Sequence, residues 1–265
     1  MINHTYKTKK YLNYAIKSKG RFGIHSPFVY SFVDEVLKDK TSYDAYSSIE
    51  RLRNKLLASG IIISQDDYGA GNEGELSFSG TKTISRVIRH STINAKYGKL
   101  LYRISKYYKP NSILELGTSL GFSTMYLAAG NPGATVHTIE GCKSTLGIAR
   151  KNFKEIGVQN IKIHNRKFDD ALPLLLQKCH GALDLVFIDG NHRYQPTVSY
   201  FEQILPFFGN NGILILDDIY WSQEMEKAWA YIKHHRDVSV TIDLFRLGIV
   251  FFKKELIKQD YILRF

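Results

Sequence analysis

The stretch from Ser112 to Thr124, which reads SILELGTSLGFST, places the tightest constraint on the fold. It begins as a short apolar run typical of a buried strand, breaks at Gly117 and Gly121, and resumes with apolar residues at helical spacing. The resumed segment stops at the GNPG of residues 130–133. Strand, glycine turn and helix in this order form the first crossing of a Rossmann-like sheet. The glycines let the backbone approach a ligand closely, and the start of the helix offers free N–H groups.

After Asn111 the chain alternates between strand-like and helix-like segments. Strands are expected over residues 112–116, 134–140, 161–164, 183–188, 212–216, 238–244 and 248–252, and helices over 122–129, 143–157, 171–179, 196–208 and 222–235. Such alternation predicts a mostly parallel sheet that is covered on both faces. We therefore predict an α/β fold that is Rossmann-like and doubly wound, with a mostly parallel seven-stranded sheet and an antiparallel last strand.

The front of the chain lacks this alternation and reads as mostly helical. Ser26 is suited to cap a helix whose first position is Pro27. Further helices are expected around residues 11–16, 46–59, 83–89 and 97–107, and residues 66–75 read as a glycine-rich polar loop. We predict a helical N-terminal extension over residues 1–95 that acts as a lid on the substrate site. Residues 96–265 are predicted to be the ligand-binding domain.

Acidic residues mark the predicted strand ends. In an open parallel sheet, ligands bind outside the carboxyl ends of the strands. The residues at or just after five of these ends are Glu115, Glu140, Asp169, Asp189 and the pair Asp217–Asp218. Loops that only connect elements are not expected to place a carboxylate at each of these ends. We therefore predict a ligand site along this edge.

The acid beside the glycine turn separates two classes of ligand. The pattern is Glu115-x-Gly117-x-x-x-Gly121, which differs from the G-x-G-x-x-G of dinucleotide sites. A pyrophosphate beside Glu115 would be repelled, and a ligand with an ammonium group would be attracted. The pattern resembles the first motif of class I S-adenosylmethionine-dependent methyltransferases, whose acidic glycine turn holds the amino acid end of the cofactor. By this resemblance the residues that bind S-adenosylmethionine are Glu115, Gly117, Thr118, Ser119, Gly121, Ser123, Glu140, Gly141, Phe168, Asp169 and Asp189.

Two of these positions have a specific role in the prediction. Glu140 lies 25 residues after Glu115, one crossover later, where a carboxylate can accept both hydroxyls of a ribose. Phe168 and Asp169 are placed to meet an adenine, the ring by packing and the acid by accepting from the amino group. Capping of the following helix by Asp169 is the alternative.

Residues 183–194, LDLVFIDGNHRY, form a second signature. It resembles the fourth strand of the catechol O-methyltransferase-like group, and more closely bacterial methyltransferases with F-I-D-G-x-H-x-Y. In metal-dependent members an Asp at this strand end binds magnesium with an Asp-Asn pair after the fifth strand, and the matching residues are Asp189, Asp217 and Asp218. Carboxylates suit Mg²⁺, although Asp218 stands where the family has Asn. Otherwise Asp189 would orient a ligand, and the pair would cap a helix.

His192 stands three residues after Asp189, the offset that the catalytic lysine has in the metal-dependent group. A histidine can deprotonate a hydroxyl that attacks the methyl group. A loop hydrogen bond or a substrate contact is the alternative. The resemblance thus implies an S-adenosylmethionine-dependent methyltransferase (EC 2.1.1.-) that forms an O-methyl product on a small hydroxylated acceptor, with His192 and Asp189 as catalytic residues.

The net charge of +11 belongs to the front of the chain. Residues 1–110 carry 19 Lys/Arg against 9 Asp/Glu, and the remainder carries 17 against 16. A basic front could steer an acidic substrate, a nucleic acid or a membrane surface, or be only a solvated face. An RNA methyltransferase is therefore one alternative, although no Asn/Asp-Pro-Pro-Tyr motif appears. A module that binds cofactor without catalysis is another, and Glu115 argues against an NAD-dependent oxidoreductase.

Cysteine usage and hydropathy bear on the compartment. Cys142 and Cys179 are too few for a disulfide framework or a zinc site. No apolar run approaches the ~20 residues of a membrane span, and no secretory signal is visible. We expect a cytoplasmic protein without a membrane span. The identity of the acceptor and the oligomeric state stay open, with a homodimer as one alternative.

Overall fold

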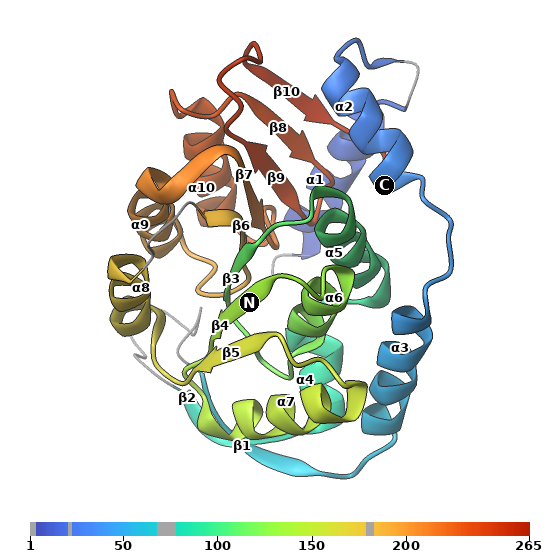
Figure 1. Ribbon diagram of the computed structural model, residues 1–265, viewed down its shortest axis with the longest axis vertical. Helices are drawn as coiled ribbons and strands as arrows, with labels where there is room; N and C mark the ends of the chain where they lie inside the picture. The colour runs from blue at the N-terminus through green and yellow to red at the C-terminus, as the bar shows by residue number, and fades with distance from the viewer. Residues whose placement is uncertain (1–3, 21–22, 68–77, 179–182) are drawn as a thin grey trace. The chain divides into compact units, whose positions relative to one another are not determined.

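The computed structural model describes residues 4–20, 23–67, 78–178 and 183–265 (Figure 1). The chain divides into two compact units. The first unit comprises residues 1–34 and 172–265, and the second comprises residues 35–171. The functional division into residues 1–95 and 96–265 stays a prediction. No described helix is both long and apolar enough to cross a membrane.

The strands of the first unit form a mostly parallel group. They are β6 (Leu183–Ile188), β7 (Phe208–Leu216), β8 (Val240–Asp243), β9 (Gly248–Phe251) and β10 (Gln259–Ile262). Their order is β10-β8-β9-β7-β6. β9 runs antiparallel to both of its neighbours, and the pairs β6/β7 and β8/β10 are parallel. Continuous apolar runs explain this group, since residues 212–216 of β7 and all of β9 are buried.

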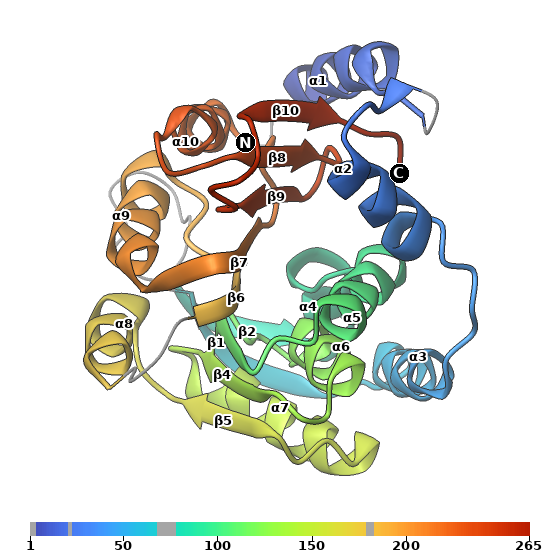
Figure 2. The ribbon, with the colours of Figure 1, turned by 45° about the horizontal axis from the view of Figure 1, so that its top comes forward.

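Helices flank both faces of these strands (Figure 2). They are α1 (His4–Lys17), α2 (Pro27–Phe32), α9 (Tyr194–Ile204) and α10 (Gln223–His234), with a π-helical turn η2 (Val33–Leu37) and a 3-10 turn η3 (Leu205–Phe207). Gly248 of β9 faces α10, since a Cβ there would lie 2.8 Å from the ring of Trp229. Phe251, three residues further along β9, packs edge-on against Phe28 and Phe32 around α2 on the opposite face.

Polar side chains attach the N-terminal helix α1 to the C-terminal elements of the first unit. The hydroxyl of Tyr6 donates to a carboxylate oxygen of Glu226 on α10 over 2.6 Å, and Lys10 pairs with the other oxygen. The hydroxyl of Tyr14 donates to the carbonyl of Leu263, just beyond β10, over 2.5 Å. The basic start of the chain is therefore held by residues more than 200 positions later.

The described part of the second unit contains a group of parallel strands and a separate hairpin. The parallel strands are β3 (Ser112–Leu116), β4 (Thr135–Ile139) and β5 (Ile161–His164), in that order, and the hairpin pairs β1 (Ile62–Asp67) with β2 (Phe78–Thr83). The helices are α3 (Asp44–Leu57), α4 (Ile84–Ser91), α5 (Ala95–Tyr108), α6 (Phe122–Gly130) and α7 (Lys143–Ile156). A further helix, α8 (Phe168–Gln177), begins in this unit and ends in the first.

Front helices hold α6, the helix that follows the glycine turn. α5 approaches it closely at Gly98, where a Cβ would lie only 2.3 Å from the ring of Tyr126. The hydroxyl of Tyr126, in turn, donates to a carboxylate oxygen of Glu50 on α3 over 2.7 Å. Tyr126 is itself fully buried. The position of α6 is thus set from the part of the chain that lacks strand and helix alternation.

The structure confirms most of the predicted elements. All seven strands expected after residue 111 form, and β9 is antiparallel as predicted. In the described part of the chain, the sheet has eight strands and not seven, because β10 follows β9 and pairs parallel with β8. Ser26 starts α2, and its hydroxyl accepts the N–H of Val29. The strands β1, β2 and β10 are not predicted by the sequence pattern, because they are short and partly polar. Residues 68–75 of the predicted glycine-rich loop and Cys179 lie outside the described residues.

Candidate functional site

The glycine turn after β3 is fixed against the neighbouring strand. Its backbone enters the left-handed region at Gly117, Ser119 and Gly121, with φ of 110°, 47° and 84°. The N–H groups of Gly117 and Thr118 both donate to the carbonyl of Ile139 at the end of β4, over 3.1 and 3.3 Å. The turn therefore has one defined shape, held at the residues of the glycine motif.

Glu115 lies beneath this turn and is fully buried. One carboxylate oxygen, Oε2, accepts from the hydroxyls of Thr124 at 2.5 Å and Thr138 at 2.6 Å. The other, Oε1, has no hydrogen-bond partner among the described residues. Burial raises the pKa of Glu115, and hydrogen bonds from Ser123, Thr124 and Thr138 oppose that shift. A buried carboxylate with an unmet oxygen favours a positively charged partner.

Glu140 connects the turn to the loop after β4. Its Oε2 accepts the N–H of Ser119, and its Oε1 accepts the N–H of Cys142, each over 2.8 Å. The amide of Asn165 donates to the carbonyls of Glu140 and Gly141 over 2.8 and 3.2 Å. The structure therefore brings Ser119, Glu140 and Gly141 together as predicted residues of one group. Asn165 is missed by the sequence reasoning, and its place just after β5 is the one signal for it.

Phe168 and Asp169 occupy the first turn of α8, which begins three residues earlier than the sequence predicts. Phe168 is half-buried and Asp169 is exposed. An acid in the first turn of a helix is favourable whether or not it meets a ligand. The adenine contact of these two residues stays a prediction.

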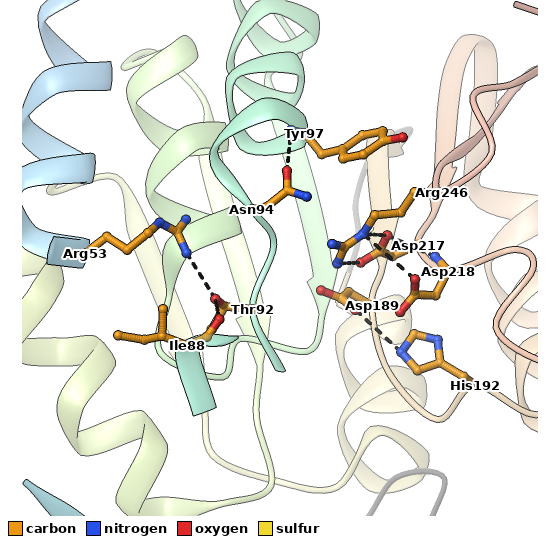
Figure 3. Close-up of polar contacts among 10 residues, drawn as sticks. All are labelled: Arg53, Ile88, Thr92, Asn94, Tyr97, Asp189, His192, Asp217, Asp218 and Arg246. Carbon is orange, nitrogen blue, oxygen red and sulfur yellow. Dashed lines mark hydrogen bonds and ion pairs between the residues drawn. The ribbon is translucent and has the colours of Figure 1, made fainter. Parts of the chain in front are cut away.

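Asp189 and His192 form a pair in the loop after β6 (Figure 3). Nε2 of His192 lies 3.6 Å from Oδ1 of Asp189, and their side chains are 19% and 18% exposed. Asn191 between them has a φ of 53°, and its amide donates to the hydroxyl of Tyr200 on α9 over 3.1 Å. This hydrogen bond fixes the bend that turns His192 toward Asp189. The pair can hold and move a proton while remaining accessible.

Asp217 and Asp218 follow β7, and Arg246 from the β8–β9 turn meets them (Figure 3). Nε and Nη2 of Arg246 donate to Oδ1 and Oδ2 of Asp217 over 2.8 and 2.7 Å. Asp217 is fully buried, so this fork is its counter-charge. Nε also lies 3.9 Å from Oδ1 of Asp218.

This arrangement does not fit the magnesium site predicted over Asp189, Asp217 and Asp218. Within the described ranges, no group of three or more His, Cys, Asp or Glu residues is arranged to hold a metal ion. The physical reason is that the guanidinium of Arg246 takes both oxygens of Asp217. The sequence gives no local signal for this, because 29 positions separate the two residues.

Residues 114–219 match the family described as a methyltransferase domain. The catechol O-methyltransferase of Niastella koreensis is 27% identical over 157 residues, which are 58% of this chain and 67% of that protein. The catechol O-methyltransferase of Mycobacterium tuberculosis is 30% identical over 129 residues, which are 48% of this chain and 56% of that protein. The chain thus spans about two thirds of one relative and little more than half of the other.

Solved methyltransferase structures share the fold. The SAH-bound methyltransferase of Podospora anserina matches with a TM-score of 0.58 at 17% identity, over 87% of this chain and 97% of that one. The O-methyltransferase of Bacillus cereus, in complex with SAH, matches with a TM-score of 0.56 at 18% identity, over 84% and 97%. Identities this low show the fold alone. These matches agree with the resemblance that the motifs indicated: residues 114–219 match a methyltransferase domain, and the chain shares its Rossmann-like fold with solved methyltransferase structures.

Proposed function

We propose that this chain is an S-adenosylmethionine-dependent O-methyltransferase that acts on a small hydroxylated acceptor. The methyltransferase domain over residues 114–219 supports methyl transfer. Relatives named catechol O-methyltransferase and caffeoyl-CoA O-methyltransferase, the latter from Zinnia elegans, support a hydroxyl as the acceptor group. The comparisons support neither the RNA methyltransferase nor the non-catalytic alternative.

The observation that carries this proposal is the unpaired carboxylate oxygen of Glu115 beneath the glycine turn. An ammonium group of the ligand would satisfy it and would stabilise the buried charge. The hydroxyl of Ser119 is also buried without a partner among the described residues, so it offers a second hydrogen bond. The oxygens of Glu140 accept the N–H groups of Ser119 and Cys142, which holds this carboxylate beside the glycine turn, where it would meet the ribose hydroxyls. These residues fit S-adenosylmethionine.

In the proposed reaction, the residues of the chain position the acceptor and remove its proton, while the methyl group is activated by the cofactor. The cofactor, when bound, supplies a methyl group that its sulfonium has already activated. The chain holds the acceptor in line, excludes water and takes the proton of the attacking hydroxyl. His192 would receive that proton, and Asp189 at 3.6 Å would stabilise the imidazolium that forms.

Calorimetric titration with S-adenosylhomocysteine tests the cofactor half of the proposal. We expect the wild-type protein to bind it, and Glu140→Gln to weaken binding by about 10- to 150-fold, because a hydrogen bond to a charged group is worth about 1.5–3 kcal/mol. Glu155→Gln is the matched control, since Glu155 lies on α7, where it pairs with the exposed Lys55. A wild-type protein that does not bind S-adenosylhomocysteine would contradict the proposal.

Mass spectrometry of reactions with catechol and other hydroxylated aromatic compounds tests the acceptor half. The expected product carries one added methyl group on oxygen. Exclusive methylation of RNA by the same preparation would overturn the assignment, and its salt dependence would identify phosphate contacts.

A further inference from the structure

The carboxylates that follow β6 and β7 are accompanied by a basic side chain, Arg246. Arg246 is carried by the turn between β8 and β9, where the N–H of Arg246 donates to the carbonyl of Leu244 over 2.9 Å. The carbonyl of Arg246 accepts the N–H of Ile219 over 3.2 Å, which holds the turn beside the residues that follow β7. Backbone hydrogen bonds therefore hold the backbone of Arg246 beside the residues that follow β7.

Both carboxylate oxygens of Asp217 already accept hydrogen bonds where a metal ion would have to bind. Oδ1 accepts from Nε of Arg246 at 2.8 Å and from the N–H of Asp218 at 2.9 Å, and Oδ2 accepts from Nη2 at 2.7 Å. A bidentate fork of this kind is geometrically specific and strong. Mg²⁺ requires near-octahedral oxygens at about 2.0–2.1 Å, and a guanidinium in contact with both oxygens excludes it.

The other two carboxylates also act on this arginine. Burial would lower the pKa of Arg246, but the bonds to Asp217 and the charges of Asp217, Asp218 and Asp189 outweigh it and raise the pKa. A second cation comes from α1, where Nζ of Lys7 lies 3.5 Å from the ring centroid of Trp221. Lys7 interacts electrostatically with Asp218 and Asp217. Two basic side chains therefore offset part of the negative charge of the three carboxylates.

We propose that Arg246 is a positioning residue that takes the place of a divalent cation among Asp189, Asp217 and Asp218, so that methyl transfer proceeds here without a bound metal. This inference rests on the proposed function, since it concerns the same acidic edge. It also accounts for Asp218 where the metal-dependent pattern has Asn. The guanidinium of Arg246 lies close enough to Asp218 to stabilise a carboxylate at this position.

Titration of Mg²⁺ and Mn²⁺ alone tests this replacement without any turnover. We expect no saturable binding to the wild-type protein. Arg246→Met removes the cation from Asp217 and Asp218 and should show saturable binding of either ion, because carboxylates without a counter-charge attract a divalent ion strongly. The double variant Arg246→Met with Asp217→Asn should lose that gain. Arg236→Met, at an arginine whose side chain is 90% exposed, is the matched control and should leave metal binding unchanged.

Wild-type measurements decide the matter if Arg246→Met does not fold. Saturable binding of Mg²⁺ to the wild-type protein that disappears in Asp218→Asn would overturn the proposal. So would methyl transfer that stops with a chelator and returns with Mg²⁺. Binding of S-adenosylhomocysteine is measured on the same samples. Loss of that binding in the wild type would count against the proposed function, whereas the metal titration alone decides the role of Arg246.

Discussion

The guanidinium of Arg246 donates to both carboxylate oxygens of Asp217, over 2.8 and 2.7 Å. Asp217 directly follows β7 and is fully buried, while Arg246 comes from the turn between β8 and β9. This pair therefore ties a parallel strand end to the antiparallel closing hairpin. Breaking a buried pair by removing one partner leaves the other charge uncompensated.

Asp217→Asn should destabilise the folded chain, because Arg246 keeps its charge and loses the carboxylate that accepts both of its short hydrogen bonds. We expect the free energy of unfolding in urea to fall by about 3–5 kcal/mol. Asp237→Asn is the control, since Asp237 is exposed and its removal should change the unfolding free energy by less than about 0.5 kcal/mol. Equal urea midpoints for Asp217→Asn and wild type would show that the pair does not hold the hairpin.

Acid should weaken the attachment of α1 through Glu226. Burial alone would raise the pKa of this carboxyl, but hydrogen bonds from Lys10 and Tyr6 outweigh burial and lower it. Because the pKa in the folded state lies below its ordinary value, Glu226 stabilises the fold above that ordinary value. The contribution is lost as the pH falls through the folded pKa.

Thermal unfolding of Glu226→Gln across a pH series measures this contribution. The variant should unfold at a lower temperature than wild type at neutral pH, and the difference should shrink as the pH drops below the ordinary range of glutamate. Glu35→Gln serves as control, because Glu35 is exposed and its substitution should give a small difference at every pH. If the difference in unfolding temperature between wild type and Glu226→Gln grows as the pH falls, the prediction is wrong.

Gly121→Ala should disrupt the turn that the cofactor would occupy. Gly121 has a φ of 84°, and a Cβ there would lie 2.3 Å from the ring of Phe153. We expect a loss of stability of about 1–3 kcal/mol from overpacking, with weaker binding of S-adenosylhomocysteine. Gly147→Ala is the control, since that glycine lies within α7 with nothing within 4 Å, and alanine there should stabilise the helix by up to about 1 kcal/mol. If Gly121→Ala binds S-adenosylhomocysteine as tightly as wild type does, the turn at Gly121 is not part of the cofactor site.

Local sequence patterns were enough to predict several elements of the fold. The apolar run and glycines of residues 112–121 predicted β3 and its turn, and Ser26 with Pro27 predicted the start of α2. Both signals lie within a few residues of the structure that they specify, so a single sequence is enough to read them.

Long-range pairing explains what the sequence pattern missed. β10 spans four residues, of which Gln259 and Asp260 are polar and exposed, and it forms because β8 offers a free edge. Arg246 is one of many basic residues, and its role depends on a turn that brings it to Asp217. The three acids could therefore be read as a metal site from sequence, while the cation that replaces the metal could not.

His192→Gln tests the proposed base on the loop after β6. The substitution removes a proton acceptor but keeps a side chain of similar reach near Asp189, so the loop should fold. We expect turnover to fall by about 10²–10⁴-fold, the range for general acid–base catalysis, with S-adenosylhomocysteine binding retained. His234→Gln, at an exposed histidine of α10, should leave turnover unchanged. If His192→Gln turns over at the wild-type rate, the histidine serves the loop or the substrate contact, and proton removal belongs to another group.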